Sequence, residues 1–276
     1  EPAQDLHRIR LLSLSIGEAV ATTVSFGMLS NLWYAEQPLG DFHFFNDNDT
    51  WLQMDKVGHS FSAQQLGLLN AELFQWAGVK QRKAIAFGAA SSFLFLSGVE
   101  VMDGFAQEFG FSTGDILANA GGSALLLGQE LIWREQRLLL RFSYSSSPYR
   151  KFNPDLLGQS PTTAILKDYN GQTYWLSADI NAFTKWEKWP EWLHMAVGYS
   201  GTGMLANRYP NSLNDRYPGI PFRRQFFLAP DVDLSRLPID NPFWKEILKA
   251  LRFIKFPSPA LEIHGGGGIR WHWLYF

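Results

Sequence analysis

The feature that most constrains this chain is its first apolar stretch, Leu11 to Tyr34, in which Glu18 is the single charged residue. The stretch is 24 residues long, and about 20 mainly apolar residues are enough for a helix to span a bilayer. Many of its residues are small, which allows helices to pack closely in a membrane. The sequence therefore predicts a helix that is long enough to cross a bilayer.

Three further helices are predicted, at about Asp55 to Ala77, Arg82 to Gln107 and Ser112 to Arg137. The first of these is amphipathic, and the second carries no charge from Ala84 to Val99. The third opens on Ser-Thr-Gly-Asp, which is typical of a helix N-terminus. We expect the four helices to form a membrane-embedded bundle over residues 1–137. The alternative is a soluble bundle, whose four buried helices would have a similar pattern of apolar residues.

The charges of this bundle are sorted by position. If the helices run alternately up and down, the basic clusters at residues 7–10, 80–83 and 134–137 share one end, and most acidic residues share the other. Aromatic residues gather at both ends. This pattern resembles the charge asymmetry and aromatic belts of membrane helices, and the alternative is a soluble bundle with polarised ends.

Composition narrows the class of protein. Aromatic residues make up 15% of the chain and charged residues 18%, against roughly 25% charged residues in ordinary soluble domains. The mean hydropathy of -0.13 is too low for a purely helical transporter. The net charge of -2 and the lack of a basic patch argue against nucleic acid as a partner. The absence of cysteine excludes disulfides, thiol nucleophiles and cysteine-ligated zinc.

A candidate site lies at the acidic end of the bundle. Residues that are three or four apart share one face of a helix, so three helix ends each present a polar group to the same layer. The candidate site residues are Asp55, Lys56 and His59, then Glu100 and Asp103, then Asp115 and Asn119.

These residue types suggest two kinds of chemistry. Carboxylates near apolar surface are costly unless they share protons, meet a cation such as Lys56, or bind a metal. The group suits a general acid–base pair or a divalent cation. The candidate metal ligands are His59, Glu100, Asp103 and Asp115. The alternative is structural: Asp55 and Asp115 cap helices, while Lys56 and His59 pair with the other carboxylates. No cofactor other than a divalent cation is expected.

Several long motifs lie in and around this layer: Phe42 to Asn48, Trp51 to His59, Gly98 to Phe105, and Gly110 to Asn119. They resemble an uncharacterised bacterial envelope family, the domain of unknown function 2279, which is related to predicted periplasmic lipoproteins. The similarity continues through Lys167 to Ser177 toward the C-terminus. The resemblance implies an envelope location and a signal peptide that is removed, and it implies no particular activity.

The helical half is also weakly similar to VanZ-like membrane proteins. The shared elements are Asp-Lys-x-x-His at residues 55–59 and Asp-Ile-x-x-Asn-x-x-Gly at residues 115–122. This similarity implies biology related to the cell wall or to glycopeptide antibiotics. The long C-terminal half lies outside the VanZ-like pattern.

The C-terminal half, residues 138–276, is predicted to be rich in β-structure. Short runs of alternating apolar and polar residues predict four or five antiparallel strands, too few for the eight of the smallest single-chain barrels. The sheet is therefore expected to be either barrel-like or open. One amphipathic helix is expected at about residues 243–253. The predicted fold class is α+β, with the bundle and the β-rich region packed as one structural unit because no long linker separates them.

Two functions remain open at this point. The preferred one is a non-catalytic envelope membrane protein, a subunit or scaffold of an outer-membrane assembly, secretion or uptake complex, because no nucleophile can be identified. The alternative is a VanZ-like membrane enzyme that acts on a lipid or cell-wall-related substrate with a histidine and carboxylates. The expected partners are the lipid bilayer and other envelope membrane proteins. The expected location is the outer membrane, with the inner membrane or the periplasm as alternatives.

Overall fold

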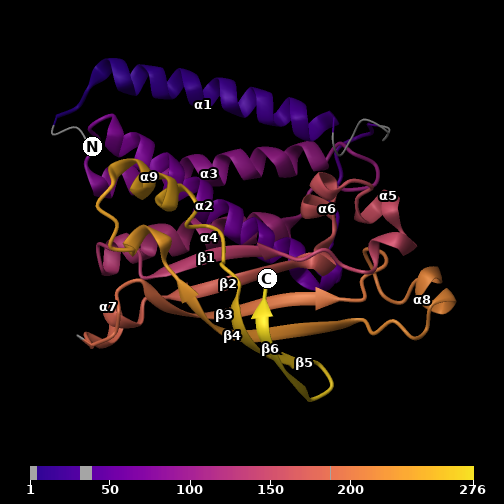
Figure 1. Cartoon of the computed structure of the whole chain (residues 1–276). Helices are drawn as coiled ribbons and strands as arrows, with labels where there is room; N and C mark the ends of the chain where they lie inside the picture. Colours follow the sequence, from indigo (N-terminus) through magenta and orange to yellow (C-terminus); the bar gives the residue numbers. More distant parts are fainter. Residues whose placement is uncertain (1–4, 32–38, 187) are drawn as a thin grey trace. The chain divides into compact units, whose positions relative to one another are not determined.

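The computed structural model describes residues 5–31, 39–186 and 188–276, and the chain divides into two compact units. The first unit comprises Glu1–Asn48 with His59–Gln136, and the second comprises Asp49–Gly58 with Arg137–Phe276. Long helices occupy the N-terminal half and an antiparallel sheet the C-terminal half (Figure 1). The mixed α+β class is therefore confirmed, while the embedding of the helices in a membrane stays a prediction.

Four long helices form the N-terminal half: α1 (Arg8–Leu29), α2 (Met54–Trp76), α3 (Gln81–Asp103) and α4 (Thr113–Ile132). The last three residues of the predicted first helix, 32–34, lie outside the described residues. Helices α1 and α3 are long and apolar enough to cross a membrane. Helix α4 begins where the sequence predicts, because the Ser112 hydroxyl accepts the backbone N–H of Asp115 as an N-cap.

Small residues allow the helices of the first unit to approach closely. A Cβ on Gly88 of α3 would lie 2.2 Å from the carbonyl oxygen of Gly67 on α2. A Cβ on Gly122 of α4 would lie 2.1 Å from the carbonyl oxygen of Ser60 on α2. Helix α2 therefore contacts both α3 and α4 backbone to backbone, at positions that only glycine permits.

The first unit combines an exposed apolar stripe and several buried polar side chains with an otherwise apolar interior, which includes Leu68, Ile85, Leu96 and Leu126. Helix α1 exposes an apolar stripe, and Leu14 is its one buried residue. The exposed residues of that stripe are Ile9, Leu12, Ile16, Val20, Val24 and Met28. Several polar side chains of α2 to α4 are buried instead, among them Gln64, Ser92, Glu100 and Asn119. Soluble domains place these classes of residue the other way round.

The second unit contains a six-stranded antiparallel sheet in which neighbours along the chain are neighbours in the sheet. The strands are β1 (Leu138–Tyr144), β2 (Gln172–Ala178), β3 (Leu193–Thr202), β4 (Arg223–Val232), β5 (Ser258–His264) and β6 (Gly268–Tyr275). The prediction of four or five strands was wrong, because β2 escaped it. Strand β2 is buried over most of its length on both faces, so it lacks the alternation of residue types by which a half-exposed strand is found.

Short helices connect these strands: α5 (Pro154–Leu157), α6 (Pro161–Lys167), α7 (Ile180–Thr184), α8 (Ser212–Arg216) and α9 (Pro242–Ala250). Helix α9 begins one residue before the segment predicted to be an amphipathic helix, about 243–253, and ends within it. Its N-terminus is capped by Asn241, whose side chain accepts the backbone N–H groups of Phe243 and Trp244.

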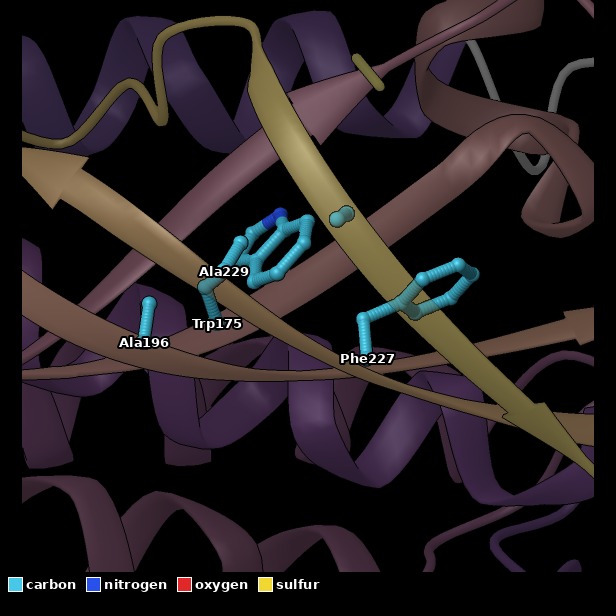
Figure 2. Close-up of a cluster of buried hydrophobic side chains, with 5 residues drawn as sticks. Trp175, Ala196, Phe227 and Ala229 are labelled. Carbon is cyan, nitrogen blue, oxygen red and sulfur yellow. The ribbon is translucent and has the colours of Figure 1, made fainter. Parts of the chain in front are cut away.

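The apolar core of the sheet is built around one large ring and several small side chains. Trp175 of β2 packs near Phe227 of β4, with ring centroids 5.8 Å apart (Figure 2). Around them lie Ala196, Ala229 and Ala260, all buried. The Trp175 indole lies over Gly198, where a Cβ would be 2.7 Å from the ring. Small residues on β3 to β5 thus leave room for the indole on β2.

Candidate functional site

The candidate site centres on His59 of helix α2. Its Nδ1 lies 3.0 Å from the side-chain oxygen of Asn119 on α4. An amide oxygen can only accept a hydrogen bond, so Nδ1 carries the proton in the neutral imidazole and Nε2 keeps its lone pair. This assignment follows from the hydrogen bond and the amide orientation. Asn119 thus sets both the tautomer and the orientation of the ring.

The other ring nitrogen faces two carboxylates. His59 Nε2 lies 3.6 Å from Oε1 of Glu100 on α3 and 3.8 Å from Oδ1 of Asp115 on α4. These separations exceed a hydrogen bond but lie within ion-pair range. The Glu100 side chain is 1% exposed and that of His59 is 18% exposed. A proton on Nε2 would therefore be stabilised by two carboxylates in a region of low dielectric constant.

The loop before α4 holds these carboxylates in place. The backbone N–H of Ser112 donates to Oε2 of Glu100 at 3.4 Å. The Ser112 hydroxyl accepts the N–H of Asp115 at 3.1 Å and donates to Asp47 Oδ1 at 2.6 Å. The positive end of the α4 helix dipole also favours negative charge at this N-terminus. Ser112 is therefore engaged as a helix cap.

The other predicted site residues are placed differently. Asp55 and Lys56 belong to the second unit, where Lys56 Nζ lies 3.2 Å from Asp55 Oδ2. The Tyr169 hydroxyl donates to Asp55 Oδ1 at 2.9 Å. Asp55 stands one turn before His59 on α2. Asp103 ends α3, and its main-chain carbonyl accepts the N–H groups of residues 106 and 110. The set joined by short distances in the first unit is therefore His59, Glu100, Asp115 and Asn119.

The same atoms are the candidate ligands for a divalent cation. With metal–ligand bonds of about 2.0–2.2 Å, two ligands of one tetrahedral ion lie about 3.4 Å apart. The His59 Nε2 separations of 3.6 and 3.8 Å from the two carboxylates are close to that value. A carbonyl oxygen that accepts the other N–H of the imidazole, as Asn119 does here, is the usual support of a metal-bound histidine. Each carboxylate therefore lies at a distance from His59 Nε2 that suits a second ligand of the same ion, and His59 and Asp115 belong to a group whose candidate ligand atoms lie within 4.8 Å of one another.

A second polar group, which sequence reasoning missed, lies within the sheet of the second unit. Arg141 of β1 is fully buried, with Nε 3.1 Å from Asp231 Oδ2 and Nη2 3.5 Å from Asp233 Oδ1. Lys255 Nζ lies 3.8 Å from Asp231 Oδ1. The sequence signal was an isolated charge inside an otherwise apolar strand, at Arg141, together with two aspartates two residues apart near the end of β4. Such spacing places both aspartates on one face.

The environment of this group changes the proton affinities of its members. Burial lowers the pKa of Lys255 to about 8, although Asp231 acts in the opposite direction. Burial alone would raise the pKa of Asp233, but the Arg141 guanidinium and the bonds from Ser235 hold that pKa below its usual value. The distances among Arg141, Asp231 and Asp233 define an ionic network, and Lys255 loses hydration where it joins that network through Asp231.

The lowered pKa of Lys255 predicts a pH dependence of stability. Between about pH 8 and 10.5 the unfolded chain holds a proton on this lysine that the folded protein has lost, so the lysine's contribution to stability rises with pH across that window. The free energy of unfolding of the wild type, relative to Lys255→Met, should rise by about 2–3 kcal/mol from pH 7 to pH 10. Denaturant titrations at several pH values check this, and parallel curves for the two proteins would contradict it.

The residues of the His59 site lie in the part of the chain that matches a known protein family. Residues 41–127 match the model of a predicted periplasmic lipoprotein family, DUF2279. This region includes His59, Glu100, Asp115 and Asn119. No curated protein and no solved structure matches the chain. The match supports a location in the cell envelope, while the outer membrane and the VanZ-like similarity stay predictions.

Proposed function

We propose that this chain, whose residues 41–127 match a predicted periplasmic lipoprotein family, is an envelope membrane enzyme that uses His59 as a general base. Its substrate class would be a lipid or a cell-wall-related molecule. One observation carries the proposal: Asn119 orients the imidazole, and Nε2 faces the carboxylates of Glu100 and Asp115. Because of this geometry, we favour an enzyme over the non-catalytic role that the sequence favoured.

The chemistry is a proton transfer that assists hydrolysis or group transfer. His59 Nε2 takes a proton from a water or a substrate hydroxyl, and the two carboxylates stabilise the resulting imidazolium. The Ser112 hydroxyl is engaged in hydrogen bonds with the backbone N–H of Asp115 and the carboxylate of Asp47. The attacking oxygen is therefore assigned to water or substrate and not to this serine. The His59 side chain is 18% exposed, which leaves it within reach of a substrate.

The polarity of the first unit supports a membrane setting for this chemistry. Helix α1 is apolar and mostly exposed, and it is long enough to cross a bilayer. Buried polar and charged groups inside apolar helices are expensive, and in membrane proteins they mark functional sites by default. Glu100, at 1% exposed, is such a group. The substrate is therefore expected to reach His59 from a lipid phase or its surface.

The proposal predicts that His59→Gln abolishes activity while leaving folded protein in the membrane. General acid–base catalysis contributes about 10²–10⁴-fold to a rate, so a loss of that size is expected. A strain that lacks the gene is complemented with each variant, and mass spectrometry of its envelope lipids and cell-wall precursors identifies the molecule that accumulates. Glu100→Gln should accumulate the same molecule to a smaller extent.

The matched control is Asn70→Ala. Asn70 joins α2 to α3 through a 2.8 Å hydrogen bond to Ser91, so this variant also removes a polar link between helices, but away from His59. It should complement fully. If His59→Gln and the control give the same profile as the wild type, His59 is not a base and the proposal is wrong.

A second candidate function is a non-catalytic subunit or scaffold of an outer-membrane assembly, secretion or uptake complex. The observation that favours it is the exposed aromatic surface of α9, where Phe243 and Trp244 protrude as a perpendicular pair with ring centroids 5.5 Å apart. Such rings are typical anchors of protein interfaces. This role predicts recovery with a larger complex after mild detergent extraction, and recovery of a clean monomer after crosslinking in cells would contradict it.

A further inference from the structure

The sheet of the second unit has one face that is apolar from edge to edge. The strand register aligns one residue of each strand in a row: Leu140, Leu176, Val197, Leu228, Leu261 and Trp271. The neighbouring row on the same face is Phe142, Tyr174, Tyr199, Phe226, Ile263 and Ile269. These two rows, which we call the apolar face, contain no charged residue.

The opposite face carries the polar side chains. In the row between the two apolar rows, Arg141 pairs with Trp175 at one edge and Glu262 with Arg270 at the other. His194 and Asp231 face each other on β3 and β4, and both are buried. The sheet therefore buries charge and exposes hydrocarbon. An antiparallel sheet in water instead buries its apolar face and exposes its polar face. An exposed apolar face opposite a buried polar face is typical of strands that face lipid.

The apolar face is open over most of its area. Val197 is 56% exposed and Leu228 47% exposed, at the centre of the sheet. At the edge strand, Trp273 is 81% exposed and packs edge-on against Trp271. The second row is covered at β2, where Tyr174 is 8% exposed, and at β3, where the Tyr199 hydroxyl donates to the carbonyl of Leu52 within the same unit.

We propose that this apolar face rests against the acyl chains of an envelope membrane. Protein interfaces carry on average about one hydrogen bond per 100–200 Å², whereas the two rows offer hydrocarbon and aromatic carbon, and the hydroxyls of Tyr174 and Tyr199 are bonded inside the unit. The absence of charge is complementary to a hydrocarbon phase. Arg224, exposed where β4 begins, and the tryptophans of β6 stand at the margins, where basic and indole groups meet lipid headgroups.

This inference does not depend on the chemistry at His59, because the sheet belongs to the second unit. The two proposals can therefore fail separately: loss of lipid contact would leave the His59 prediction standing, and the reverse also holds.

The absence of cysteine allows a direct test with single spin labels. Val197→Cys and Leu228→Cys each place a nitroxide at the centre of the apolar face, and Asp155→Cys places one at an exposed charged position on the short helix α5. The full chain is reconstituted in vesicles of phosphatidylethanolamine and phosphatidylglycerol. Collision rates with oxygen, which dissolves in lipid, and with a water-soluble nickel chelate are then measured by electron paramagnetic resonance.

We expect a several-fold higher oxygen-to-nickel ratio at residues 197 and 228 than at residue 155. A ratio equal to that of residue 155 would mean contact with water, and low collision rates with both reagents would mean a covering of protein; either result overturns the proposal. As a second measurement, Leu228→Arg should lower the fraction of protein that floats with vesicles several-fold. Leu156→Arg, at an apolar residue of similar exposure (39%) on α5, should not. Equal flotation of both variants would also overturn the proposal.

Discussion

Asp231→Asn is expected to lower the free energy of unfolding of the second unit by about 3–5 kcal/mol, because it removes one partner of a buried ionic network. Arg141 loses the carboxylate 3.1 Å from its Nε, and Lys255 loses the one 3.8 Å from its Nζ. Both cations remain buried, with Asp233 as the remaining carboxylate near Arg141. Arg141 would keep Asp233 alone and Lys255 would lose its ion pair with Asp231 while buried, which is far more costly than the loss of a surface ion pair.

The measurement is denaturant unfolding of the full chain in detergent, followed by tryptophan fluorescence, since Trp175 lies in the core of the same sheet. Asp155→Asn is the matched control. It makes the same chemical change at an exposed aspartate that accepts one hydrogen bond from Gln159 at 2.7 Å, and it should shift stability by less than about 0.5 kcal/mol. Equal effects of the two variants would show that the network does not stabilise the sheet.

Gly122→Ala is expected to separate α2 from α4 and to disable the His59 site. The new Cβ would lie 2.1 Å from the Ser60 carbonyl oxygen, a distance that forces the backbones apart. The contacts next to this point are the 2.9 Å bond from the Ser60 hydroxyl to Ala118 and the His59–Asn119 bond. Overpacking of this kind costs about 1–3 kcal/mol or more, and the site loses its geometry as well.

The neighbouring glycine provides the control, because Gly121→Ala makes the same change one residue earlier. There a Cβ would lie 3.9 Å from the Ser60 hydroxyl, in ordinary contact, and alanine favours a helix over glycine by about 1 kcal/mol. Gly121→Ala should therefore be neutral or stabilising, and Gly122→Ala destabilising. Thermal unfolding in detergent gives the sign for each. Two shifts of the same sign would mean that α2 and α4 are not packed as described.

Several parts of the candidate site could be predicted from the sequence because they depend on local periodicity. The pair Asp115 and Asn119 shares a helix face through its spacing alone. The up-and-down order of the helices then brings that face to the ends of α2 and α3, where His59 and Glu100 lie. The sequence did not show which of the seven predicted site residues contact one another. Which residues make the short contacts depends on the rotation of each helix about its axis, which sequence spacing leaves open.

The sheet shows where local patterns stop being informative. Five strands are recognisable from alternation or aromatic runs in the sequence, but β2 is buried on both faces and has no such pattern. The ionic network was missed because Arg141, Asp231 and Lys255 are far apart in the chain. Asp231 and Lys255 each look like an ordinary charge near a strand end or in a loop, and the charge of Arg141 inside a strand does not by itself identify its partners.

The sequence by itself determined the class of elements, the apolar length of α1, the N-cap of α4 and the spacing of polar residues along each helix, since these depend on neighbours within a few residues. Only the tertiary structure decided which carboxylates face His59, which glycines bring helices together, and which side of the sheet is apolar. Those features depend on register and on helix rotation. A shift of one residue in a strand, or of a part-turn in a helix, would reverse them at little cost to the local pattern.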